Sequence, residues 1–313
     1  MAIDFDMYDT AIQIVTCLLV FVCYMVGATG NYLVCSVVYS DPAMQTVTHL
    51  ILVNLAAADL IGCLLSLPIV FVLFVYQWQP EILAILGNIH WVVTSAVGFH
   101  VCACHILLSI DRYDAVIRHA NPRITKERMK AIATWLWALG LVDTILTITL
   151  VATSTVLWIP AATSINSNVC TNLTTVLWMG AAVLFGTIVA VTHSFVSVKI
   201  AVAKNKQHLI QIMGQENLNT ELRFTTMSVW VVLCFTVSTA PFLVLGILTC
   251  VIGDVDHSFE KVSYITTELS YAINPIIYAH FVSGLSEAMK IKFKSLFGCK
   301  EHNNIHPELP LNP

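Results

Sequence analysis

Few residues of this sequence carry a charge, and those that fall within apolar segments are the first candidates for chemistry. Asp59 and Glu268 interrupt long hydrophobic runs, and Arg112 ends one. An ionised side chain in a hydrocarbon environment costs free energy unless it is paired, hydrated or neutralised by a proton. Each of the three is therefore a candidate functional residue.

These candidates do not form a catalytic pattern. The sequence has no glycine-rich phosphate loop, no nucleophile elbow and no Cys/His set with metal-ligand spacing. His90, His100 and His105 fall on one expected helix, but their spacing is not that of a zinc site. We expect a protein that is not an enzyme.

The elements that must position these residues are membrane helices. Apolar residues make up 57% of the chain and charged residues 11%, and the mean hydropathy is +0.79, which is typical of membrane proteins. A helix needs roughly 20 mostly apolar residues to cross a bilayer. Seven segments satisfy this: 11–38, 47–75, 83–113, 129–153, 175–203, 222–250 and 260–281. We predict an all-α membrane protein, a seven-transmembrane helix bundle.

The predicted chain has four parts and a defined orientation. Residues 1–10 form an extracellular N-terminus without a cleavable signal peptide, 11–281 the transmembrane domain, 282–299 an amphipathic membrane-surface helix, and 300–313 a cytoplasmic tail. Of the fifteen Lys and Arg, only Lys261 lies on the side of the N-terminus. Because cytoplasmic loops carry the excess of Lys and Arg, we expect a multi-pass plasma-membrane protein with its C-terminus inside.

Motifs on four of the expected helices carry a family resemblance. They are Gly30-Asn31, Asn54-Leu55-Ala56-Ala57-Ala58-Asp59, Ser109-Ile110-Asp111-Arg112-Tyr113 and Asn274-Pro275-Ile276-Ile277-Tyr278. Together they resemble the rhodopsin-like (class A) G-protein-coupled receptors over almost the whole chain. The resemblance implies a receptor that converts binding of an extracellular ligand into activation of a heterotrimeric G protein. The alternative is a ligand-independent, constitutively active protein or a non-signalling partner of another receptor.

The resemblance assigns switch roles to residues at the inner end of the bundle. Arg112, between Asp111 and Tyr113, is expected to contact the G protein, and Asn274, Pro275 and Tyr278 belong to the same machinery. Glu221 precedes Pro241 by twenty residues, which is roughly 30 Å of helix. Glu221 is therefore placed to restrain Arg112. The alternative is an ordinary solvated charge.

A polar core is expected below the ligand pocket, formed by Asn31, Asp59 and Ser270, with Asn31 and Asn274 as partners of Asp59. The resemblance also implies a sodium ion at Asp59. Two positions depart from that pattern, because Val101 replaces the third-helix polar residue and Tyr271 lies beside Ser270. A protonated Asp59 in a hydrogen-bonded network is the alternative.

The expected ligand pocket lies in the outer half of the bundle, at Thr94, Ser95, Gly98, Thr239, Phe242, Tyr264 and Glu268. Thr94 replaces the Asp of aminergic receptors, and Glu268 replaces the Schiff-base Lys of opsins, so monoamines and covalent retinal are disfavoured. Glu268 either balances a cationic ligand or is neutral and hydrogen-bonded to a neighbour such as Tyr264. The ligand class stays open among small molecules, lipids and peptides, and we expect no nucleic-acid partner.

Other departures affect activation and the outer surface. Gly87 stands where most relatives have the disulfide cysteine of the third helix; Cys170 and Cys250 are the candidates for a different pair. In lacking this cysteine, the chain resembles the melanocortin, lysophospholipid and cannabinoid receptors. His105, seven residues before Arg112, occupies a layer that is normally apolar in the receptors this chain resembles. It is either hydrogen-bonded or loosens the inactive state.

The last predictions concern the membrane surface. Leu285, Met289, Phe293 and Phe297 recur at helical spacing among lysines, which is typical of an amphipathic helix that lies on anionic lipids. Cys299 is a candidate for palmitoylation. Asn172 begins an Asn-Leu-Thr glycosylation motif in the expected second outer loop.

Overall fold

The computed structural model describes residues 5–75, 80–118, 121–158, 167–252 and 257–296, in some helix ends by their backbone alone. The helical elements follow in this order: α1 (Phe5–Ser40), η1 (Pro42–Met44), α2 (Val47–Ile61), η2 (Gly62–Ser66), α3 (Leu67–Val75), α4 (Pro80–Ile117), α5 (Lys126–Trp158), α6 (Ser167–Met213), α7 (Gln215–Ile252), α8 (His257–Phe281) and α9 (Ser283–Leu296).

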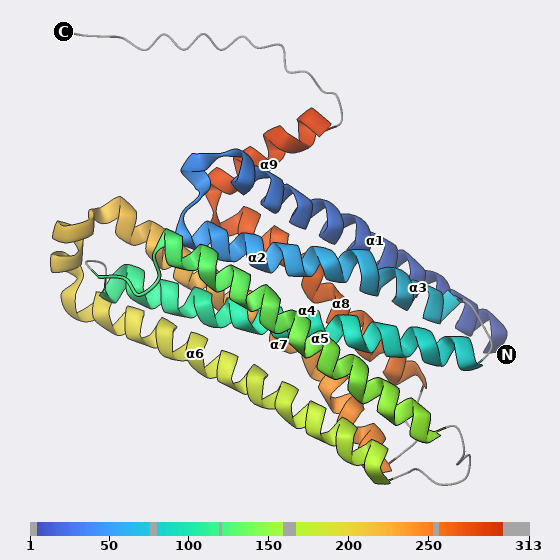
Figure 1. The fold of residues 1–313 in the computed structure, drawn as a ribbon. Helices are drawn as coiled ribbons and strands as arrows, with labels where there is room; N and C mark the ends of the chain where they lie inside the picture. The colour runs from blue at the N-terminus through green and yellow to red at the C-terminus, as the bar shows by residue number, and fades with distance from the viewer. Residues whose placement is uncertain (1–4, 76–79, 119–120, 159–166, 253–256, 297–313) are drawn as a thin grey trace.

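These elements form seven long helical rods because α2, η2 and α3 follow one another without a break (Figure 1). Six of the rods are long and apolar enough to cross a membrane over their described residues, and α8 is the exception. It nevertheless packs against α1 and α7 inside the bundle. The predicted seven-helix bundle is confirmed, and α4 is its central helix, in contact with α2, α3, α5, α6 and α7.

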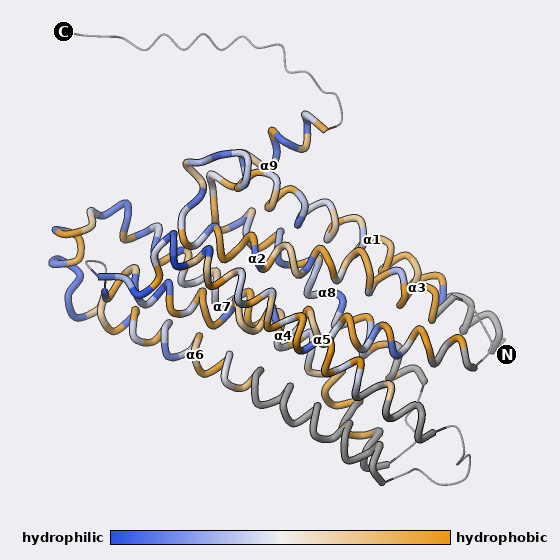
Figure 2. The backbone as a smooth tube through the Cα atoms, in the orientation of Figure 1, coloured by the Kyte–Doolittle hydropathy of each residue, from blue (hydrophilic) through white to orange (hydrophobic). Residues whose placement is uncertain are grey.

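The outer surface of the bundle is apolar along its length, and polar residues collect at one end (Figure 2). Phe21, Trp135 and Val237 are 59%, 69% and 63% exposed in the isolated chain. Side chains of this kind lie against lipid in a membrane protein, where they carry no hydrophobic cost.

The second rod contains a π-helical turn that the sequence pattern does not predict. Gly62–Ser66 forms η2, just before Pro68. A helical proline lacks an N–H and its ring clashes with the carbonyl of the fourth residue before it. A π turn widens the helix and relieves that crowding. It also rotates Ser66 and every later residue of the rod relative to α2.

Close helix contacts are made where glycine replaces a side chain. A Cβ on Gly62 would lie 2.6 Å from the Tyr271 ring, and one on Gly30 would lie 2.6 Å from Pro275. Small residues let membrane helices approach closely and gain packing energy. These two glycines bring the first two rods against α8, which carries Glu268 and Asn274.

A single residue joins α6 and α7. Gly214 has φ +81°, the left-handed conformation that commonly ends a helix. The preceding turns bend at Asn205, where the backbone is non-helical. Beyond this bend, Leu209 and Leu218 pack with Val116 and Val198 in a small hydrophobic cluster, separate from the main core.

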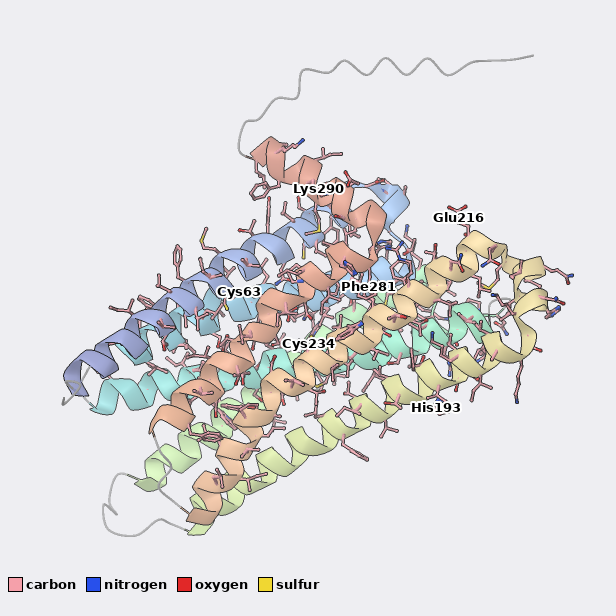
Figure 3. The ribbon with its side chains drawn as sticks, turned by 180° about the vertical axis from the view of Figure 1, so that it is seen from behind. Cys63, His193, Glu216, Cys234, Phe281 and Lys290 are labelled. Atoms are coloured by element: carbon pink, nitrogen blue, oxygen red, sulfur yellow. The ribbon has the colours of Figure 1, made fainter. Side chains whose placement is uncertain are left out.

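The end of the bundle also carries α9, which leaves α8 after Phe281 and bears Lys290 on its exposed side (Figure 3). Leu285 and Met289 are buried, whereas Phe293 is 42% exposed. The amphipathic pattern therefore places part of its apolar side on the bundle. Phe297 lies outside the described residues.

Candidate functional site

One polar cluster, which we call the inner polar cluster, is built around Arg112 near the end of α4 that the sequence predicts to be cytoplasmic. Arg112 is 1% exposed, and its Nη1 donates to Glu221 Oε2 of α7 at 2.5 Å. Its Nη2 contacts Asp111 and Thr48, and Thr48 donates to Asp111 Oδ2 at 2.8 Å. The expected contact between Arg112 and Glu221 is present. It ties α7 to α4 and α2.

An aromatic ring covers the same guanidinium. The Arg112 guanidinium carbon lies 5.0 Å from the centroid of Phe224, which is one turn beyond Glu221. His49 meets Phe224 edge-on, with centroids 6.0 Å apart. A cation over an aromatic face is stabilised by the ring quadrupole, most strongly when desolvated. Arg112 is thus held by charge, hydrogen bonds and packing from three helices.

Tyr113 points elsewhere. Its ring stacks on His193 of α6 at 6.4 Å, and the Arg123 guanidinium lies 5.2 Å from it. Arg123 also pairs with the buried Asp114 at 2.7 Å. The hydrogen bond that Arg123 Nε donates to Asp114 raises the pKa of Arg123 above its usual value. This clamp fixes the loop after α4, and the sequence interpretation missed it.

The polar core is centred on Asp59. Asn274 Nδ2 donates to Asp59 Oδ2 at 2.8 Å, as expected. The second expected partner is wrong, because Asn31 Nδ2 donates to the Tyr271 carbonyl at 2.8 Å. The cause is the close approach of α1 to α8, which presents a backbone oxygen to Asn31. The Tyr278 hydroxyl is buried without a partner among the described residues.

The surroundings of Asp59 do not fit the sodium coordination that the resemblance implies. Val101, at the third-helix position, is 1% exposed and offers no oxygen. The Ser270 hydroxyl donates to the Thr267 carbonyl at 2.8 Å, and the neighbouring Tyr271 is fully packed. Asp59 Oδ1 is buried and has no partner among the described residues. A proton would remove the charge of this buried carboxyl group, so the protonated alternative needs no metal ion.

A second polar cluster, which we call the outer polar cluster, lies towards the other end of α4 and joins α4, α8 and η2. Glu268 Oε1 accepts from Ser66 Oγ at 2.6 Å and lies 3.0 Å from His90 Nε2. Thr94 Oγ1 lies 3.4 Å from both His90 Nε2 and Ser66 Oγ. His90 and Glu268 are each 1% exposed. Of the two alternatives for Glu268, the hydrogen-bonded one is therefore favoured, with Ser66 and His90 as the neighbours.

Aromatic rings connect this cluster to α7. Tyr264 meets His90 edge-on at 5.0 Å, and Phe242 lies 5.8 Å from Tyr264 and 5.3 Å from Trp91. Tyr264 thus contacts both the His90 imidazole and the Phe242 ring. Phe242 directly follows Pro241 in α7. A movement of the Tyr264 or Trp91 ring would therefore displace the turn of α7 that contains the proline.

Comparison with known proteins identifies the architecture. The family described as "7 transmembrane receptor (rhodopsin family)" matches residues 30–278. The chain belongs to this family. The fold resembles that of squid rhodopsin, with a TM-score of 0.69 at 18% identity, over 94% of this chain and 89% of that one.

Sequence relatives of this receptor include three kinds of named receptor. The RYamide receptor of Drosophila melanogaster is 32% identical over 139 residues, which is 44% of this chain and 30% of that protein. Somatostatin receptor type 1 of Rattus norvegicus is 25% identical over 87% of this chain and 68% of its own length. The type-1 angiotensin II receptor of Cavia porcellus is 36% identical over 37% of this chain and 33% of its own length. The receptor thus matches about a third of the length of two of these relatives.

The receptor assembles only part of the pocket set predicted from sequence. Thr94, Phe242, Tyr264 and Glu268 meet in the outer cluster. Ser95 instead donates towards Asp143 of α5 at 3.4 Å, and the Thr239 hydroxyl donates to the Phe235 carbonyl at 2.8 Å. A Cβ on Gly98 would meet nothing within 4 Å.

His105 also departs from expectation. It packs edge-on against Phe235 at 5.3 Å, and neither ring nitrogen has a hydrogen-bond partner among the described residues. The hydrogen-bonded alternative is wrong for the described residues, because the ring packs against Phe235 and meets no donor or acceptor. His105 places an unsatisfied polar ring between α4 and α7 of the receptor.

Four predicted modification positions cannot be placed. The side chains of Cys170, Asn172 and Cys250 lie outside those that the structure describes, and so does residue Cys299. The disulfide, glycosylation and palmitoylation assignments therefore stay predictions.

Proposed function

We propose that this protein is a G-protein-coupled receptor that responds to an extracellular ligand at the outer polar cluster and activates a heterotrimeric G protein at the inner one. The observation that carries the proposal is the buried Arg112, held by Glu221 of α7. The basic inner end and membership of the family support it. Lys and Arg placement supports an extracellular N-terminus in the plasma membrane.

Nucleotide exchange on a purified G protein tests this proposal. The receptor is reconstituted in lipid vesicles as Glu221→Ala, which frees Arg112, and as the double variant Glu221→Ala/Arg112→Ala. We expect exchange above the empty-vesicle rate in the first and none in the second. Arg128→Ala in the same background is the charge-matched control, since Arg128 is exposed and its side chain bonds only the Arg123 carbonyl among the contacts described. Undiminished exchange without Arg112 would reject the proposal.

We further propose that the ligand is a peptide. Its relatives are receptors for RYamide, somatostatin and angiotensin II, which are peptides. The outer cluster supports a ligand that needs no single cationic group, because Glu268 already has His90 and Ser66 as partners. A monoamine-like cation would have to displace a buried histidine.

Thermal unfolding with the three peptides as probes tests the ligand class. A ligand that binds only the folded state stabilises it by about 2.7 kcal/mol at 100 times its Kd. We expect at least one peptide to raise the Tm of the wild-type receptor and a smaller rise in Tyr264→Ala. Identical melting curves with all three at high micromolar concentration would argue against a peptide of this group.

Ligand-independent signalling is the second candidate function. It is favoured by His105, whose unpaired ring separates α4 from Phe235 of α7. An unpaired buried polar group costs about 1–3 kcal/mol, and this cost destabilises the resting contact. If this candidate is right, wild-type receptor shows basal exchange that His105→Leu suppresses.

A further inference from the structure

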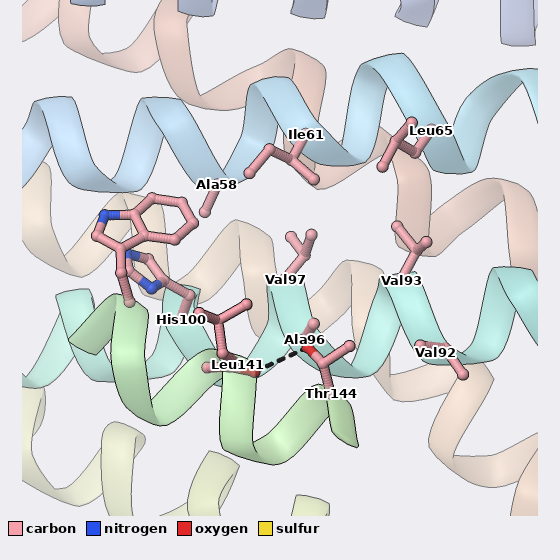
Figure 4. A pocket seen from close by; sticks show the side chains of 12 residues that line it. Ala58, Ile61, Leu65, Val92, Val93, Ala96, Val97, His100, Leu141 and Thr144 are labelled. Atoms are coloured by element: carbon pink, nitrogen blue, oxygen red, sulfur yellow. Dashed lines mark hydrogen bonds between the residues drawn. The ribbon is translucent and has the colours of Figure 1, made fainter. Parts of the chain in front are cut away.

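A cavity opens on the lipid-facing side of the bundle, and none of its lining residues belongs to either polar cluster. It has a volume of about 230 Å³ and lies between the second rod, α4 and α5 (Figure 4). Its lining includes the small residues Ala96 and Gly140, and also Ile61, Leu65 and Leu141, which are 36%, 50% and 65% exposed. The cavity is therefore an apolar groove reached from the bilayer.

One strongly polar side chain lines this groove. His100 is 2% exposed, and neither of its ring nitrogens has a hydrogen-bond partner in the part of the chain that the structure describes. The neighbouring polar groups are already engaged. Trp137 stacks on His100 at 4.1 Å but donates its indole N–H to Asn54 at 3.1 Å, and Thr144 donates to the Gly140 carbonyl at 2.8 Å. A buried imidazole without partners beside a cavity of this size indicates that a ligand supplies the missing hydrogen bond.

The depth of His100 limits what that ligand can be. The apolar span of α4 runs from Ile85 to Ile117, so His100 lies next to its midpoint, about 15 Å below the membrane interface. The lining continues along α4 from His100 to Val92, a rise of about 12 Å towards the start of the helix. An occupant that enters from the bilayer must therefore present a polar atom at its deep, apolar end.

We propose that this groove binds a lipid acyl chain that carries a hydroxyl group in mid-chain, with the hydroxyl on His100. Packed helices are about 8–10 Å apart, so a slot floored by small residues is one side chain wide and suits a single hydrocarbon chain. A neutral imidazole has one donor and one acceptor, which a hydroxyl complements. Both ring nitrogens of His100 are buried by the protein. Binding of the hydroxyl therefore includes a half-turn of the imidazole, which exchanges the positions of its nitrogen and carbon atoms at almost no change in shape.

Photo-crosslinking of the full chain in phosphatidylcholine nanodiscs tests the proposal without a signalling readout. The probes are a mid-chain hydroxy-octadecanoic acid and octadecanoic acid, each with a diazirine at the chain end. We expect the hydroxylated probe to label peptides of α4 and α5, with about fivefold stronger apparent binding than the plain acid, the gain of roughly one net hydrogen bond.

Two variants and one control separate the contributions. His100→Phe keeps the aromatic packing and should abolish the preference for the hydroxylated probe, whereas Gly140→Leu fills the groove and should remove labelling by both. His105→Phe removes another unpaired histidine of α4, outside the groove, and should leave labelling by both probes unchanged. Equal labelling of the wild type by both probes would overturn the proposal, as would a preference that survives His100→Phe. Displacement by a side-chain-hydroxylated sterol but not by unlabelled hydroxy acid would overturn it in favour of a sterol site.

Discussion

At the scale of single residues, the proposed activation depends most directly on the contact between Arg112 and Glu221. The Arg112 side chain is 2% exposed and that of Glu221 is 25% exposed, so the pair is better shielded than a surface ion pair. We expect Glu221→Ala to raise basal nucleotide exchange about threefold to fivefold, equivalent to roughly 1 kcal/mol. The gain is moderate because Asp111 and Thr48 still hold Arg112.

The matched control is Glu216→Ala, which removes an exposed carboxylate from the first turn of the same helix. It should leave exchange unchanged at equal receptor density. If Glu221→Ala gives wild-type exchange, the contact has no restraining role.

The outer pair makes a second prediction at this scale. Because His90 and Glu268 are both buried, the loss of either one leaves the other without its main partner. Breaking a buried pair costs more than replacing both members. In a double-mutant cycle of His90→Phe and Glu268→Gln, we expect a coupling energy of about 1–3 kcal/mol, measured by thermal unfolding in detergent. Additive single effects would show that the two side chains do not stabilise each other.

Residue types were predictable here, but partners were not. A carboxylate at 268 and amides at 31 and 274 are visible in the sequence, because each departs from an apolar pattern. Their partners depend on helix rotation about the axis, which no residue spacing specifies. Asn31 therefore bonds a carbonyl of α8 rather than Asp59, and Glu268 bonds His90, whose position on the sequence looked like that of any helical histidine.

At the scale of elements, hydrophobic length located the helices to within a few residues at most ends, because lipid thickness fixes how long an apolar run must be. The ends furthest from prediction are both ends of α6, which begins at Ser167 instead of 175 and extends to Met213 instead of 203, and the start of α7, which is Gln215 instead of 222. The two extensions that meet at Gly214 are polar, and hydropathy alone does not detect them. The π turn η2 was also missed, since its composition is that of ordinary helix.

The π turn gives a prediction about packing. Gly62→Ala puts a Cβ within 2.6 Å of the Tyr271 ring, and that ring is buried and cannot move aside freely. We expect the free energy of unfolding to fall by about 1–3 kcal/mol, as for other overpacked cores, and the Tm to fall with it. Gly186→Ala is the control, because its Cβ would meet nothing within 4 Å. Equal melting temperatures for the two variants would show that α8 yields to the added methyl group.

At the scale of the whole molecule, the described residues form two hydrophobic clusters that hold different parts of the receptor. The main core runs through the bundle and surrounds both polar clusters, whereas the cluster of Val116, Val198, Leu209 and Leu218 holds the extensions of α6 and α7 against the end of α4. Glu221 lies less than one turn beyond Leu218. The small cluster therefore fixes the helix turn from which Glu221 reaches Arg112.

This arrangement predicts that Leu218→Ala loosens the inner extension without unfolding the bundle. Leu218 is 1% exposed, so its truncation leaves a cavity that lowers the free energy of unfolding by about 2–5 kcal/mol. We expect this loss to be confined to the small cluster. We expect faster amide hydrogen exchange over residues 206–222, unchanged exchange in the membrane-spanning part of α4, and higher basal nucleotide exchange because Glu221 loses its support. Leu233→Ala, a 47%-exposed position on the lipid-facing side of α7, should cause none of these changes. Faster hydrogen exchange throughout the bundle would mean instead that the two clusters unfold as one unit and that the small cluster has no separate role.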